Sequence, residues 1–278
     1  MQLFPILSRL TDRKCLIFKV SCLMKKIALF VFVLVLASCS CSHSVRDMGV
    51  KLSGEQASEY RNLRGFEKIE VNGSPTVYYD QTDSFSVLVK GPKELVGNII
   101  TDVDGRTLSI RNRGKIGMFN VSFGRGDDLA IYVCGPDLTG VSLRGSGDFL
   151  SRYPVDTDVI DIQLKGSGNI EFNSIICDRC NAEVVGSGDL DIKQLDAQYT
   201  DASLTGSGDI DIRQKNVVAT RLAVRGSGDI DVYFLEGCGS VDAELAGSGD
   251  ITLKGEVTNL NKNKRGSGDI NTGSLRIR

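Results

Sequence analysis

The sequence GSGDLDI at residues 186–192 returns as GSGDIDI at 206–212 and as GSGDIDV at 226–232. The motif Gly-Ser-Gly-Asp, with Asn in place of Asp once, begins seven times, at Gly145, Gly166, Gly186, Gly206, Gly226, Gly247 and Gly266. Successive copies start 21, 20, 20, 20, 21 and 19 residues apart. A fixed period in this range indicates one supersecondary unit that stacks on copies of itself.

Apolar and polar residues alternate with period two on both sides of each motif. In the copy at Gly206, Ala202 and Leu204 precede the motif, and Ile210 and Ile212 follow it. Period two indicates a strand with one buried face. We expect both glycines of each motif on the inner side of a corner where no side chain fits, with the serine and the aspartate facing outward.

The period and the alternation together predict an all-β fold, a single-stranded parallel β-helix (β-solenoid) with rungs of about 20 residues. A second apolar patch later in each unit supplies another wall, so each rung has room for three short strands and three corners. A leucine-rich repeat shares the period, but the regular leucine spacing and helical return leg of that fold are not found. Calcium-binding rolls repeat every nine residues instead.

The regions that flank the repeats differ from them. Strand-like segments between residues 63 and 137 lack the period and are expected to form irregular N-terminal β rungs, so the predicted β-helical domain spans residues 63–278. Residues 39–62 are predicted to be a flexible tether, because they contain Ser and charges without an apolar period. At the other end, Lys262 and Lys264 stand where the apolar pair is expected, and they should protect the last open edge.

Residues 1–38 have the features of a leader that contains a lipoprotein signal peptide, whose natural start we place at Met24. Two lysines follow Met24, then an apolar run that is about half as long as a membrane-spanning helix requires. The sequence LASC at 36–39 is similar to the lipobox of bacterial lipoproteins, so Cys39 is predicted to carry the lipid. The location that follows is the cell envelope, most simply the outer membrane, with the periplasmic and the surface face both open.

The charge of the mature chain bears on its partners. Cleavage before Cys39 would remove six Lys or Arg residues and one Asp, which changes the formal net charge from −2 to about −7. An acidic body argues against nucleic acid as a partner. The membrane is the expected partner of the lipid. A glycan or a protein is the candidate ligand, and a homo-oligomer is an additional alternative.

Two further features suggest chemistry. Asp189 with Asp191, Asp209 with Asp211, and Asp229 with Asp231 should form outward columns on three successive rungs, where calcium could neutralise them. The alternative is that the first Asp of each pair caps its own turn, which the Asn at position 169 favours. The spacing of Cys177 and Cys180 would suit a redox dithiol or half a zinc site, but without a second pair we interpret Cys177 as a small core residue.

Three segments that precede the first motif, together with the motif series itself, resemble a known family. They are FEKIEVNG at 66–73, GRTLSI at 105–110 and VCGPDL at 133–138. With the motifs they resemble the auto-transporter adhesin family that carries the head GIN domain, over residues 64–275. The resemblance implies a β-helical head and an adhesin-like role. It implies no catalytic residue and no particular ligand.

The sequence therefore predicts a lipid-anchored envelope protein that is not an enzyme and that has a binding or structural role. One alternative is a calcium-dependent glycan-binding solenoid. The other is a polysaccharide lyase or hydrolase, since paired acids on a β-helix can cleave glycosidic bonds. Against catalysis, the acids recur on every rung without an interruption, and the single His lies at position 43 in the tether. No cofactor is predicted apart from the calcium of the first alternative.

Overall fold

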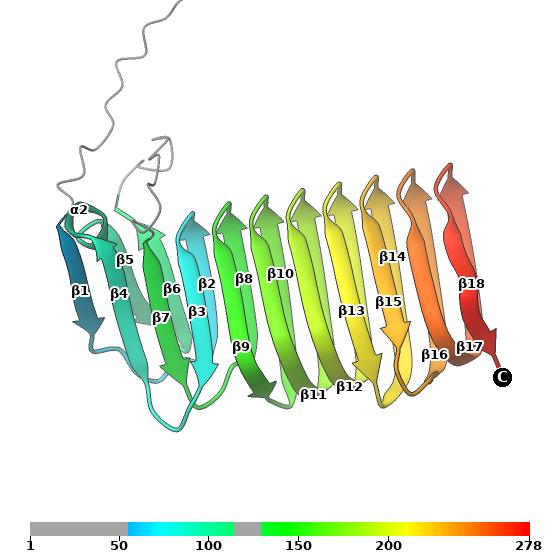
Figure 1. Cartoon of the computed structure of the whole chain (residues 1–278), viewed down its shortest axis with the longest axis horizontal. Helices are drawn as coiled ribbons and strands as arrows, with labels where there is room; N and C mark the ends of the chain where they lie inside the picture. Colours follow the sequence, from blue (N-terminus) through cyan, green and yellow to red (C-terminus); the bar gives the residue numbers. More distant parts are fainter. Residues whose placement is uncertain (1–54, 114–128) are drawn as a thin grey trace, which may run out of the picture. The chain divides into compact units, whose positions relative to one another are not determined.

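The computed structural model describes residues 55–113 and 129–278. The chain divides into two units, Met1–Met48 and Gly49–Arg278, and every described residue belongs to the second. This unit is built of strands, with one short helix, α2 (Lys93–Val96), among the described residues. Figure 1 shows the strands stacked side by side along one axis.

The strands before the first complete repeat are short. They are β1 (Gln56–Arg61), β2 (Lys68–Gly73), β3 (Thr76–Gln81), β4 (Ser86–Pro92), β5 (Ile99–Asp104), β6 (Thr107–Asn112), β7 (Ala130–Gly135), β8 (Gly140–Gly145) and β9 (Asp148–Asp156). The later strands are longer because several continue around a bend. They are β10 (Val159–Gly166), β11 (Asn169–Gly186), β12 (Asp189–Gly206), β13 (Asp209–Lys215), β14 (Val217–Gly226), β15 (Asp229–Phe234), β16 (Cys238–Gly247), β17 (Ile251–Gly266) and β18 (Ile270–Ile277).

The first glycines of the motifs lie in a single line along the stack, which we call the corner line. Parallel pairing joins Gly145 to Gly166, and continues in register through Gly186, Gly206, Gly226, Gly247 and Gly266. The predicted parallel β-solenoid is therefore confirmed. The line also includes Gly73, which pairs with Gly145. The segment Gly73-Ser74-Pro75 is thus an additional copy of the corner that the sequence motif does not reveal, because Pro75 replaces the second glycine.

Each regular coil has three sides. In the coil that begins at Asn169, the alternation of buried residues shifts by one position between Phe172 and Ile175, and again between Cys177 and Cys180. The chain bends at these two places and at the Gly-Ser-Gly corner. We call the residues before each motif side 1, those directly after it side 2, and the short remaining segment side 3.

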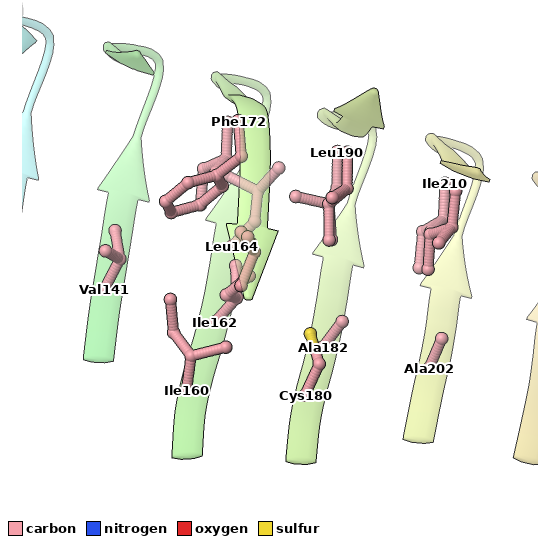
Figure 2. Packing of buried hydrophobic residues seen from close by; sticks show 14 of the residues in the cluster. Val141, Ile160, Ile162, Leu164, Phe172, Cys180, Ala182, Leu190, Ala202 and Ile210 are labelled. Atoms are coloured by element: carbon pink, nitrogen blue, oxygen red, sulfur yellow. The ribbon is translucent and has the colours of Figure 1, made fainter. Parts of the chain in front are cut away.

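The core is a single cluster that runs the length of the stack. Figure 2 shows that side-1 residues such as Ile162 and Ala182 point toward residues of the following side, among them Phe172 and Leu190. Identical sheet positions repeat on successive coils, so each apolar side chain packs against the equivalent residue above and below it. This arrangement excludes water from the interior, which is the main stabilising contribution to the fold.

The N-terminal coils are wound out of sequence order. Strand β2 pairs in parallel with both β6 and β8, and β3 pairs in parallel with both β7 and β9. The coil formed by β2 and β3 therefore lies between the β6–β7 coil and the β8–β9 coil. Beyond it, β4 is antiparallel to β7, β1 is antiparallel to β4, and β5 is antiparallel to β6. The irregular rungs predicted for this region exist, but their order and their antiparallel pairs were not predicted.

The predicted tether, residues 39–62, extends too far. Residues 56–61 form β1, which pairs with β4 along its whole length. The sequence pattern gave no indication of this strand, because β1 lies at an edge and most of its side chains are exposed on both faces. The remainder of the predicted tether up to residue 54, and the leader 1–38 with Met24, lie outside the described residues, as does Cys39. The described residues include no helix that could span a membrane.

Candidate ligand-binding face

The first column of motif aspartates joins one coil to the next. A carboxylate oxygen (Oδ1) of Asp189 accepts a hydrogen bond from the backbone N–H of Asp209 at 3.0 Å, and Asp209 accepts one from Asp229 at 3.2 Å. The same contact continues from Asp229 to Asp250 and from Asp250 to Asp269. The interpretation that each Asp caps its own turn named the wrong hydrogen-bond donor, because the N–H that bonds to each carboxylate belongs to the following coil.

The second column consists of carboxylates that face one another across the coils. Parallel pairing aligns Glu171, Asp191, Asp211 and Asp231. Partial burial, with further contributions from neighbouring carboxylates, raises the pKa of Asp191 and the pKa of Asp211. An ion pair of Lys193 with Glu171 relieves part of the repulsion.

The two columns do not assemble into a metal centre among the described residues. No group of three or more His, Cys, Asp or Glu side chains there has a geometry that could hold a metal ion. One oxygen of each first-column carboxylate from Asp189 to Asp250 is already used between coils. The geometry therefore supports a structural role for Asp189, Asp209 and Asp229 and gives no support to calcium.

Cys177 and Cys180 are both buried in the core. Burial raises the pKa of Cys177 to about 12 and the pKa of Cys180 well above its ordinary value. Thiols of this kind are protonated and unreactive at neutral pH. The interpretation of Cys177 as a core residue agrees with this environment.

A groove runs along the outer surface of side 1. Its first hollow has a volume of about 590 Å³ and extends across β6, β2, β8, β10, β11 and β12. Gly140 and Ser142 on β8 line the hollow, and their small side chains leave space over this strand. Lys68 and Asp161, from the coils on either side of Gly140, approach to 3.9 Å. Arg144 pairs with Glu70 at 3.4 Å in the same hollow.

A second hollow continues the groove toward the C-terminal end. It has a volume of about 560 Å³ and crosses β11, β12, β14, β16 and β17. Its floor includes Ala219 and Ser240, and Arg179 and Tyr199 line one end. Asp201 lines both hollows, so the two adjoin along side 1, and we call them together the groove. At about 4.8 Å per strand, the groove from β6 to β17 is about 40 Å long.

One repeated sheet position runs along the groove from end to end. It carries, in spatial order, Lys68, Gly140, Asp161, Asn181, Asp201, Arg221, Asp242 and Asn261. Two amides bond to the carboxylate beside them, Asn181 to Asp161 at 2.8 Å and Asn261 to Asp242 at 3.1 Å. Among the described residues, Asp201 and Arg221 have no side-chain hydrogen bond or ion pair. The centre of the groove therefore presents one unpaired carboxylate beside one unpaired guanidinium.

Sequence reasoning missed this face, although a pattern for it was present. Every residue of the column lies five positions before the first glycine of a corner, as Asp201 does before Gly206. The prediction followed the motif itself, where the acids are most regular. The groove depends instead on where small side chains adjoin large ones on neighbouring coils.

Comparisons with known proteins agree with this architecture. Of solved structures, a putative adhesin from Bacteroides fragilis is 28% identical, with a TM-score of 0.67, and the match covers 80% of this chain and 99% of that one. A putative lipid binding protein from Parabacteroides distasonis is 22% identical with a TM-score of 0.60, covering 78% and 98% of the two chains, and shows the same fold. No curated protein matches the chain.

The sequence also matches a family over two overlapping segments, residues 65–238 and 221–278. Together these segments cover the β-solenoid from just before β2 to the C-terminus, including the corner line and the groove. The family is described as "Putative auto-transporter adhesin, head GIN domain", and the predicted resemblance is confirmed. This chain belongs to the family of auto-transporter adhesin head GIN domains.

Proposed function

We propose that this protein is a non-catalytic, adhesin-like protein of the cell envelope that binds an extended polymer along the groove of side 1. The observation that carries the proposal is that the two hollows adjoin at Asp201, which lines both of them. A ligand pocket for a compact metabolite would be closed and largely apolar. An open, polar groove of this length suits a chain such as a glycan or an extended protein segment.

The groove supports binding better than the motif columns do. The first-column carboxylates already bond to the next coil, and the second column is crowded with like charges. The groove instead offers hydrogen-bond donors and acceptors and charges of both signs, among them the unpaired Asp201 and Arg221. Mixed polar groups around a hollow can fix the orientation of a polar ligand.

A groove-filling variant tests this assignment. Ser203 lines the first hollow, and Ser203→Tyr should place a ring in the path of the ligand. The matched control is Thr252→Tyr, which adds the same side chain at an outward strand position on side 2. Full-length protein and both variants would be applied to an array of envelope and host glycans and matrix proteins. We expect Ser203→Tyr to lose at least tenfold in affinity and Thr252→Tyr to bind as wild type does.

Equal binding by the two variants would place the ligand elsewhere and overturn the groove assignment. The bound polymer should also be recovered at its original length after incubation with the protein. Release of new reducing ends or shortened chains would instead support the lyase or hydrolase alternative.

We further propose that a lipid on Cys39 anchors the protein to the envelope, most simply at the outer membrane. The support is the LASC sequence at 36–39 together with the family match, since an adhesin acts from an envelope surface. Cys39→Ser should move the protein from the membrane fraction to the soluble fraction and remove incorporation of labelled palmitate. Cys41→Ser is the matched control. A membrane-bound, unlabelled Cys39→Ser protein would contradict the lipid anchor.

A further inference from the structure

We infer that the second hollow is a sugar subsite in which a pyranose ring stacks on Tyr199. This inference rests on the proposed function and deepens it, because it names the class of ligand and the residue that recognises it. It depends on the surroundings of one tyrosine ring, on the small residues beside that ring, and on the polar groups that surround the space.

One face of the Tyr199 ring is already covered. The guanidinium carbon of Arg179, from the preceding coil, lies over the ring at 4.9 Å from its centroid. Arg179, Tyr199 and Ala219 occupy the same sheet position on three successive coils. The opposite face of the ring is therefore directed along the stack toward Ala219.

The neighbours on the open side leave room for a ligand. Ala219 and then Ser240 follow Tyr199 at this position, and neither can fill the space that a larger residue would occupy. Tyr199 itself remains 38% exposed. The hollow of about 560 Å³ beside the ring has room for a pyranose.

Polar groups border the same space at the height of the ring. Asp201, Arg221 and Asp242 lie on the next outward position of β12, β14 and β16, and all three line the hollow. The face of a pyranose that carries C–H groups is apolar and fits against an aromatic ring, whereas its hydroxyls need donors and acceptors around the edge. Tyr199 with these three residues provides both kinds of contact.

The spacing of the coils favours a glycan over a peptide. Strands in a sheet repeat every 4.7 to 4.9 Å. A pyranose unit in an extended β-linked chain advances by a similar distance, so consecutive sugars would meet equivalent positions on consecutive coils. A peptide that crosses the strands has no such match, because its residues advance by about 3.3 Å. We therefore expect a β-linked polysaccharide chain.

The test uses the full-length protein with soluble β-linked glucan, xylan, mannan and chitin oligosaccharides of two to eight units. Binding would be measured by calorimetry and by saturation-transfer NMR. We expect a subset of these glycans to bind with affinity that increases with length, Tyr199→Ala to weaken binding at least tenfold, and Tyr199→Phe to keep it. Tyr233→Ala is the matched control, because Tyr233 is 44% exposed on side 2, away from the groove.

The outcomes separate this inference from the proposed function. If Ser203→Tyr abolishes glycan binding while Tyr199→Ala leaves it unchanged, the groove binds the polymer and the sugar subsite at Tyr199 is wrong. If no glycan binds but a protein on the array does, the ligand is a protein segment and the sugar inference is overturned. If Tyr199→Ala loses its circular dichroism spectrum, Ala219→Leu, which fills the hollow without touching the core, decides the question by the same tenfold criterion.

Discussion

At the scale of single residues, the glycines of the corner are confined by the coil on which they stack. Gly206 has φ near 135°, and a Cβ added to it would lie 2.0 Å from the carbonyl oxygen of Gly186. Gly208 meets the carbonyl of Gly188 at the same distance. The expectation that the inside of a corner excludes side chains is correct in its result. The obstacle, however, is the backbone of the preceding coil.

This confinement predicts that Gly206→Ala is strongly destabilising. The variant combines a disfavoured φ with a backbone clash, so its free energy of unfolding should fall by about 3 kcal/mol or more. Gly273→Ala is the control, because no atom lies within 4 Å of a Cβ at that position. The control should remain within about 0.5 kcal/mol of wild type in urea unfolding. Similar losses in the two variants would mean that the clash is not what selects glycine at Gly206.

The carboxylate of Asp211 predicts a pH-dependent stability. Partial burial and the neighbours Asp231 and Asp191 raise its pKa in the folded state. The unfolded chain therefore releases this proton at lower pH, and the folded state loses stability as the pH rises through the raised pKa. Asp211→Asn should accordingly raise the melting temperature at pH 7 and increase the free energy of unfolding by less than about 1 kcal/mol. The advantage should shrink as the pH approaches 4, and an advantage that is constant with pH would rule out this cause.

At the scale of elements, hydrogen bonds inside the core join side 3 of one coil to side 1 of two adjacent coils. Gln214 on β13 is fully buried among apolar residues. Its carbonyl oxygen accepts a hydrogen bond from the hydroxyl of Thr200 at 2.9 Å, and its amide donates one to the hydroxyl of Thr220 at 2.7 Å. Since Thr200 and Thr220 lie on side 1 of adjacent coils, one side chain of side 3 joins three strands.

Gln214→Leu should therefore cost about 1 to 3 kcal/mol, because it leaves two hydroxyls buried without their partner. Replacing the whole network, with Leu at position 214 and Val at positions 200 and 220, should recover most of that loss. An apolar substitute of similar shape removes the unsatisfied groups together with the bonds. Denaturant unfolding of the single and triple variants measures the difference. A triple variant that is less stable than the single one would show that the hydrogen bonds contribute more stability than burial of their polar groups costs.

At the scale of the whole β-solenoid, the two ends of the stack are finished differently. Antiparallel strands β1, β4 and β5 cover the N-terminal coils. Among the residues that the structure describes, no antiparallel strand pairs with β18. Lys262 and Lys264 occupy the positions that Ala243 and Leu245 have on the preceding coil. Lys264 also pairs with Asp269, the last aspartate of the first column. The charges keep this open end from pairing with another sheet edge.

Replacing both lysines, Lys262→Leu with Lys264→Leu, should turn the open end into an apolar edge. The variant should associate as its concentration increases, whereas wild type should not associate through this end. Light scattering after size-exclusion chromatography measures the change. Lys165→Leu with Lys254→Leu removes the same charge from inner coils and is the control. Association of the control as well would attribute the effect to net charge.

The sequence by itself determined the period of the coil, the corner line and the buried face of the regular strands. These features are local, because strand alternation has a period of two residues and each corner needs glycine at a fixed place. The family was also recognisable from Phe66 and the segments that follow it.

Only the tertiary structure decided the order of the N-terminal coils, the strand β1 and the groove. Strand pairing joins segments far apart in sequence, so no local pattern shows that β2 lies between β6 and β8. The groove exists because Gly140 lies beside Lys68 and Asp161, and Ala219 beside Tyr199, which are larger residues from neighbouring coils. The depth of a surface depends on which side chains become neighbours, and here the stacking of coils determines those neighbours.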